Sequence, residues 1–418
     1  MNILDMYKGN EELALEGDVV AVAEQAAEEV ARAEVAEATV EMQEAAQQVE
    51  VLTEKMEEME ETVEELEETV DGMESLLSSG NFSAIAMTSL YNRAAKLNDK
   101  LGGKSVSRMG AENFSDASTA RLLARDGMEG FMDKVKGWAK TAIEFIKNIF
   151  NAVINFFVGL VNKTAGLQRR IDATRKRLDA AEKLKEKVKL GKWNLFVDYE
   201  KNGAKGALLK NFSWKDKLDA YLNVAKDVEK ANLSAFNSAY DSLVSALKEA
   251  AKDMADAGVK ESGSDTKQVI ADNGGIRVLV TFHDGEIKSG EDAVAAARKL
   301  KVMVGKTPES KLGTGEVDAK ADKATLGSTL TSLAGYVKTM RESKIQQKFS
   351  KAERDRVIGR LNAIAAGNAG SEDMEKSRKE SVSIVKAVYS SGASVTKTLV
   401  SLTGDAVDAG ISMVAAHV

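Results

Sequence analysis

The sequence predicts a mainly α protein, with a long acidic N-terminal coiled-coil helix and a helical body that carries a small α/β insertion. The chain has one proline in 418 residues, and proline breaks helix interiors, so long helices fit. Apolar residues recur at alternating steps of three and four between residues 35 and 77, which is a heptad pattern. Only residues 267–305 show the strand-like alternation and turn residues typical of a small sheet.

Residues 11–79 are expected to form one helix with an apolar seam over six heptads, which predicts a coiled coil and self-association. The seam consists of Val35, Ala38, Met42, Ala45, Val49, Leu52, Met56, Met59, Val63, Leu66, Val70, Met73 and Leu77. Its flanks between Glu54 and Glu74 are almost all glutamate, and such like charges repel along a helix. A basic partner or assembly would relieve this repulsion. A solvated acidic spacer helix is the alternative interpretation.

A short helix is expected over Ser83–Leu101, followed by a Ser/Gly-rich linker from Gly102 to Thr119. Residues 128–161 predict a helix with a wide apolar face. This helix suits a protein core, and it also suits packing on a membrane or a partner.

Residues 163–192 are basic, with 11 lysines and arginines against four acidic residues, and their apolar spacing predicts a further helix. Cations on a helix surface neutralise phosphates without reading bases. The candidate contacts with a DNA backbone are Arg169, Arg170, Arg175, Lys176 and Arg177. A solvated face paired with acidic neighbours is the alternative.

The rest of the chain is expected to be helical around one small sheet. An amphipathic helix is predicted over 215–257. Val269–Phe282 reads as a hairpin with its turn at Asp272–Gly275, followed by a helix over Gly290–Leu300 and a strand from Lys301. Residues 381–418 are expected to form a packed helix pair. We therefore divide the chain into an acidic arm and linker (1–112, a candidate propeptide), a helical domain (113–265), an α/β island (266–315) and a C-terminal helical region (316–418).

Charge is distributed unevenly along the chain. Residues 1–112 hold 26 acidic and 8 basic side chains, whereas the remainder holds 39 acidic and 50 basic ones. Such a split indicates contact with nucleic acid or a membrane, or a charged tail.

The inventory of catalytic side chains is poor, so we expect no enzyme, no cofactor and no metal site. The chain has no cysteine and two histidines. His283 and His417 are expected to be surface histidines, with His417 in a fraying terminus. No motif of a phosphate loop, serine hydrolase or zinc protease is present. The sequence also lacks a secretory signal, and no stretch of about 18 residues is both apolar and uncharged, as a simple membrane span requires.

An acidic helical region that runs into a Ser/Gly linker with Met109-Gly110-Ala111-Glu112, followed by Asn113 and a net-basic body, resembles the internal head proteins of giant tailed bacteriophages. The resemblance covers mainly residues 1–160. In that family the prohead protease removes an acidic propeptide after a small residue, any residue and glutamate. The resemblance implies cleavage between Glu112 and Asn113, with Gly110 and Ala111 completing the motif. Glu112 is preferred over other matches because nicking concentrates in mobile linkers.

This resemblance implies a virion structural protein that is made in the host cytoplasm and packaged inside the capsid. It would belong to the prohead inner core, be matured by the prohead protease and be ejected with the DNA. Its expected partners are other core proteins, the protease and, without sequence preference, the DNA backbone, since an acidic arm and a basic body would neutralise each other until the arm is removed. Two alternatives stay open: a membrane-active helical protein of pore or ejection-conduit type, and an uncleaved cytoplasmic coiled-coil scaffold.

Overall fold

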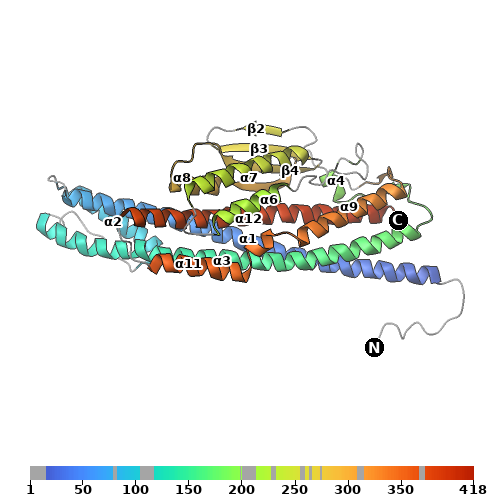
Figure 1. The fold of residues 1–418 in the computed structure, drawn as a ribbon, viewed down its shortest axis with the longest axis horizontal. Coiled ribbons are helices and arrows are strands. Elements are labelled where there is room, and N and C mark those ends of the chain that lie inside the picture. The colour runs from blue at the N-terminus through green and yellow to red at the C-terminus, as the bar shows by residue number, and fades with distance from the viewer. Residues whose placement is uncertain are drawn as a thin grey trace, which may run out of the picture. The chain divides into compact units, whose positions relative to one another are not determined.

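The computed structural model is mostly helical, with two small antiparallel sheets (Figure 1). It describes residues 16–78, 82–103, 117–197, 199, 213–226, 232–254, 259–262, 266–273, 275–307, 315–366 and 372–418. The helices are α1 (Glu16–Ser78), α2 (Ala84–Lys100), α3 (Ala117–Ala180), α4 (Trp193–Phe196), α6 (Ser213–Val224), α7 (Leu233–Met254), α8 (Gly290–Lys299), α9 (Lys323–Arg341), α10 (Ile345–Lys348), α11 (Lys351–Ala366) and α12 (Glu372–Ala416). The strands are β1 (Lys187–Val188), β2 (Val259–Ser262), β3 (Thr266–Asn273), β4 (Ile276–His283), β5 (Lys301–Lys306) and β6 (Val317–Asp318).

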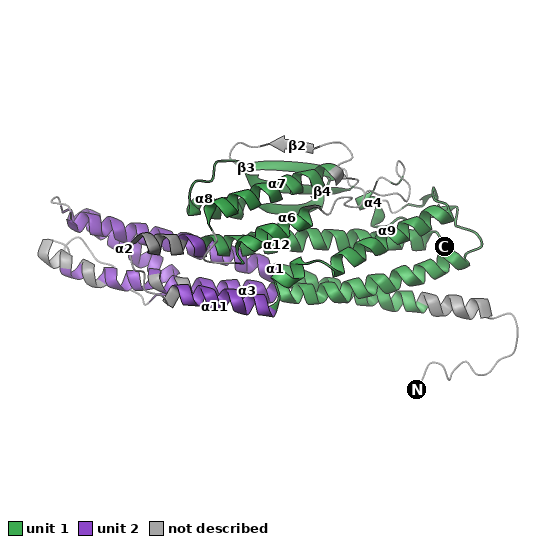
Figure 2. Ribbon diagram, viewed as in Figure 1, with its two compact units in different colours: residues 1–46, 153–350, 383–418 green, residues 47–152, 351–382 purple. Residues whose placement is uncertain are grey.

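The chain forms two compact units, and each unit is assembled from segments that are distant in sequence (Figure 2). Unit 1 contains residues 1–46, 153–350 and 383–418, and unit 2 contains residues 47–152 and 351–382. Helices α1, α3 and α12 each contribute residues to both units. Three helices therefore run from one unit into the other, and each of them lies within one of the predicted ranges 1–112, 113–265 and 316–418. The division of the chain into those ranges, with 266–315 as the fourth, stays a prediction.

Helix α1 confirms the predicted long N-terminal helix, and its seam is covered by the same chain. Ten of the thirteen seam residues are buried. In unit 1, Cβ atoms built on Gly159 and Gly166 of α3 would lie within 3.0 Å of the side chains of Met42 and Val35, so α3 approaches the seam closely. In unit 2, the seam joins a core cluster that includes Tyr91 of α2 and Phe131 of α3. Self-association of this seam between copies stays a prediction.

Helix α3 runs without a break through the two segments that we expected to form separate helices. The expected helix over 163–192 is wrong in its last part, because α3 ends at Ala180 and residues 187–188 pair with β6. The helix buries its wide apolar face, including Phe150, Phe156 and Phe157. This burial confirms the core interpretation of residues 128–161.

The predicted α/β island is present in unit 1 as a four-stranded antiparallel sheet in the order β2-β3-β4-β5. The predicted hairpin pairs Asn273 with Ile276, and β4 buries every second residue, from Ile276 to Phe282. Helix α7 contacts β3 and β4, and helix α8 contacts β4 and α7 (Figure 1). The expected helix over 215–257 is wrong as a single element, because the chain forms α6 and α7 as separate helices, and β2 was not anticipated.

The predicted C-terminal helix pair is one continuous helix, α12, because Ser390–Gly392 and Gly404 interrupt the apolar pattern but not the helix. Residues 383–418 of α12, which belong to unit 1, are mostly buried, and their small side chains allow other elements to pack closely against the helix. A Cβ atom on Gly410 would lie 3.0 Å from side-chain atoms of Leu333 in α9 and of Trp193 in α4. Small residues in α12 thus allow three elements of unit 1 to meet.

Candidate functional site

Three of the five predicted DNA contacts on α3 are engaged in ion pairs within unit 1. Arg169, whose side chain is 59% exposed, forms a salt bridge of 2.8 Å with Glu34 of α1. Arg177 pairs with Glu28 of α1, and its guanidinium also donates to the main-chain oxygen of Val418 at 3.3 Å. The acidic arm therefore supplies counter-ions to two of the predicted DNA contacts.

Arg170 faces the interior, with 2% of its side chain exposed. Its guanidinium pairs with Asp408 of α12 and donates to the Ser412 hydroxyl at 3.0 Å, while its Nε has no partner. A buried charge is tolerated only when it is paired and hydrogen-bonded. Arg170 is thus an internal counter-ion to α12, and a phosphate has no access to it in this arrangement.

The remaining two predicted contacts form no ion pair with a residue that the structure describes. Arg175 is half-buried and donates to the Thr331 hydroxyl of α9 at 3.0 Å. Lys176 is exposed. The structure therefore brings the five residues to one helix but not to one surface, because consecutive residues of a helix point about 100° apart.

Two buried cations and one half-buried cation on α3 are spaced by seven residues, which places them on one face of the helix. Lys163 donates to Asp405 of α12 at 2.7 Å with only 2% of its side chain exposed. Arg170 and Arg177 follow at the same interval and use Asp408 and Glu28. The sequence analysis did not predict this face, because the carboxylates that pair with its cations lie more than 100 residues away along the chain. One feature of the sequence could have indicated these pairs: Asp405 and Asp408 are the only acidic residues in 381–418.

The predicted cleavage motif, Gly110 to Asn113, lies outside the described residues, between α2, which ends at Lys100, and α3, which begins at Ala117. Two other matches to the motif end at Glu28 in α1 and at Glu129 in α3. A helical segment cannot bind a protease as an extended strand, and these two matches are disfavoured for that reason.

The expectation that His417 is an exposed, fraying histidine is wrong. Its ring is buried, and Nδ1 lies 2.9 Å from the Met413 carbonyl, which can only accept, so Nδ1 carries the proton. Nε2 then accepts from the Tyr199 hydroxyl at 3.0 Å, and that hydroxyl accepts from the Lys320 amide. Burial lowers the pKa of His417 below its usual value, and the nearby charge of Lys185 lowers it further.

The second histidine, His283, is half-buried at the end of β4. Its backbone amide donates to the Tyr240 hydroxyl at 2.9 Å. Within the described part of the chain, no group of three or more histidine or acidic side chains is arranged to hold a metal ion. The two histidines therefore have different surroundings, and only His417 is enclosed.

Two helices are long and apolar enough to cross a membrane by length and composition, although neither contains the uncharged stretch of about 18 residues that we looked for in the sequence. They are Gly127–Ala180 within α3 and Glu380–Ala416 within α12. More than half of each apolar window is buried inside the protein. Core helices pass the same test, and the ion pairs between α3 and α12 indicate that each helix is part of the other's surroundings.

These features define a mainly helical protein in which four cations of α3 pair with carboxylates of α1 and α12. The chain matches the family model of phiKZ-like phage internal head proteins over residues 11–416 and belongs to this family. It is therefore a phage internal head protein, located inside the capsid. The comparisons with curated proteins and with solved structures find no match.

Proposed function

We propose that the protein is a non-enzymatic component of the prohead inner core that is cleaved between Glu112 and Asn113 by the prohead protease and ejected with the DNA. Membership of the internal head protein family over residues 11–416 is the observation that carries the proposal. The charge split supports it, because acidic residues dominate before Glu112 and basic residues after it. The position of the motif between two helices adds to this support.

Contacts between the arm and the body support a role for the arm in neutralising charge before the genome enters. Glu28 and Glu34 of α1 pair with Arg177 and Arg169 of α3. While these pairs persist, DNA has to compete for the arginines. The proposal therefore includes sequence-independent binding to the DNA backbone, which weakens steeply as salt rises.

The test is the intact mass and N-terminal residue of the protein recovered from purified phage particles. The proposal expects a chain that begins at Asn113, because the protease cuts after the Gly110-Ala111-Glu112 motif. A full-length chain, or a C-terminal fragment that begins at a residue other than Asn113, would overturn the cleavage step. Absence of the protein from DNA-filled heads would overturn its place in the mature virion.

A further inference from the structure

A second basic feature of unit 1 lies just after α3, in the non-helical stretch that leads to α4. Residues 183, 185, 187 and 189 are all lysine, and all four are exposed. Val188, which lies between two of them, and Leu190, which follows the last, are buried, while Leu184 is half-buried and Glu186 is exposed. We call residues 183–189 the lysine segment. Its apolar residues anchor the chain while its lysines point to the solvent.

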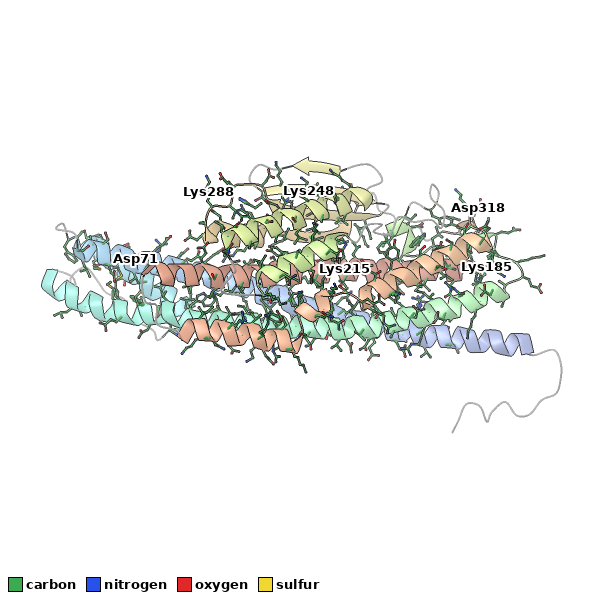
Figure 3. The ribbon with its side chains drawn as sticks, viewed as in Figure 1. Asp71, Lys185, Lys215, Lys248, Lys288 and Asp318 are labelled. Carbon is green, nitrogen blue, oxygen red and sulfur yellow. The ribbon has the colours of Figure 1, made fainter. Side chains whose placement is uncertain are left out.

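The lysine segment is held in place by backbone hydrogen bonds to two other parts of unit 1. Lys187 and Val188 form β1, which pairs with β6, and the Ala319 amide donates to the Glu186 carbonyl at 2.8 Å. The amide of Lys185 donates to the His417 carbonyl at 3.0 Å (Lys185 and Asp318 of β6 are labelled in Figure 3). A fixed backbone presents several lysines together, so less ordering is needed when a ligand binds.

Three lysines of the lysine segment differ from Lys163, Arg169, Arg170 and Arg177 of α3, each of which pairs with a carboxylate. Lys183, Lys187 and Lys189 make no ion pair with any residue that the structure describes. Lys185 uses its Nζ to donate to the Val418 main-chain oxygen at 2.7 Å. Glutamates do occur nearby, but between residues 182 and 192 there are five lysines and only two glutamates. This segment therefore keeps unneutralised positive charge at the surface.

We propose that the lysine segment binds the phosphate backbone of double-stranded DNA without reading its sequence. Lysine offers three donors on a flexible stem, which suits contact with phosphates. Inside a phage head, the polyanion that such a surface meets is the packaged genome. The proposal rests on the proposed function, and it places the DNA contact outside the α3 arginines, two of which pair with the arm.

The experiment compares DNA binding by the full-length protein and two triple variants over a series of salt concentrations. The test variant is Lys183→Gln, Lys187→Gln and Lys189→Gln, which leaves Lys185 in place. The control variant changes three exposed lysines elsewhere in unit 1, which make no ion pair with a described residue, and so removes the same charge. The control substitutions are Lys217→Gln, Lys338→Gln and Lys344→Gln.

The proposal expects the test variant to bind DNA at least ten-fold more weakly near 0.15 M salt, with a salt slope that is smaller by about 3 if each lysine contacts one phosphate. The control keeps the wild-type slope, and thermal unfolding shows that both variants fold. Equal binding by wild-type and test variant overturns the site but leaves the proposed function standing. Failure of the wild-type protein to bind DNA even at low salt overturns the DNA contact in the proposed function itself. Loss of binding to anionic lipid vesicles, with DNA binding unchanged, assigns the segment to a membrane and also overturns the proposal.

Discussion

Arginine residues that are adjacent in the α3 sequence have opposite physical roles. Arg169 is exposed and pairs with a glutamate at the surface, where an ion pair contributes little to stability. Arg170 is enclosed and pairs with Asp408, and removal of one partner leaves a buried charge without compensation. A basic run in a sequence therefore does not indicate how many of its charges are available to a ligand.

The first prediction concerns this pair of arginines. We expect Arg170→Met to lower the free energy of unfolding by about 2–3 kcal/mol, because Asp408 loses its partner but is partly exposed and regains some hydration. The control, Arg169→Met, is expected to change it by about 0.5 kcal/mol or less. Chemical denaturation of both variants checks this. Equal effects of the two substitutions would contradict the assignment of Arg170 to the interior.

His417 is the residue with the clearest dependence on pH. Because burial lowers its pKa in the folded state, the unfolded chain binds a proton at a higher pH than the folded chain does. Its contribution to stability is therefore present above the unfolded pKa of 6.5 and is lost as pH falls below that value.

The second prediction follows from this linkage. We expect the wild-type protein to lose stability as the pH falls from about 6.5 to about 5.5, above the range in which carboxylates titrate. His417→Gln is expected to flatten this part of the profile relative to that of the wild-type protein. Thermal unfolding of both proteins, measured across the pH range, checks this. An unchanged profile in His417→Gln would show that another group is responsible.

At the scale of elements, the contact between α1 and α3 depends on a glycine in α3, Gly159, which has no side chain. A Cβ atom on Gly159 would lie 3.3 Å from the carbonyl oxygen of Ala38 and from the amide nitrogen of Met42. These backbone atoms cannot rotate away as a side chain can. The two helices therefore approach each other at a distance that only glycine permits.

The third prediction tests this close approach. Gly159→Leu is expected to lower the free energy of unfolding by about 1–3 kcal/mol, because the added side chain forces α1 and α3 apart. Gly335→Leu is the control in α9 of the same unit, since a Cβ atom there meets nothing within 4 Å. That control is expected to be neutral or stabilising, because leucine favours helix more than glycine does. If both variants unfold alike, the helices do not meet as described.

Helices and strands were predicted well where a local sequence pattern is sufficient to determine them. The heptad spacing located α1, and the turn residues and alternation located β3 and β4 with their helix α8. Local patterns did not predict that residues 215–257 form two helices, or that α3 and α12 are each one continuous helix. Glycine and serine weaken a helix by only about 1 kcal/mol each, so burial decides whether the helix continues.

The candidate site was less predictable than the fold, because its partners are far apart in the chain. The pairing of Arg170 with Asp408 joins residues separated by 238 positions. Nothing local distinguishes such an arginine from one that faces solvent. The exposed lysines at 183, 187 and 189 were included in the predicted basic region, but the prediction of a helix there did not anticipate a strand in which Val188 is buried between two exposed lysines.

At the scale of the molecule, the acidic arm is part of both compact units. Residues 16–46 of α1 belong to unit 1, and residues 47–78 belong to unit 2 with α2. Its buried seam holds it through apolar contacts, each worth roughly 1.5–3 kcal/mol for a fully buried side chain. Cleavage after Glu112 removes one covalent bond and none of these contacts.

We therefore predict that a cut between α2 and α3 does not by itself release the arm. The most direct measurement uses the full-length protein with a site for a sequence-specific protease inserted after Glu112, cleaved to completion and analysed by size-exclusion chromatography and native mass spectrometry. The fragments are expected to remain together even at about 1 M salt, which screens the ion pairs of Glu28 and Glu34 but not the apolar seam. Separation of the N-terminal fragment under these conditions would contradict the account, since it would show that the arm is a detachable appendage.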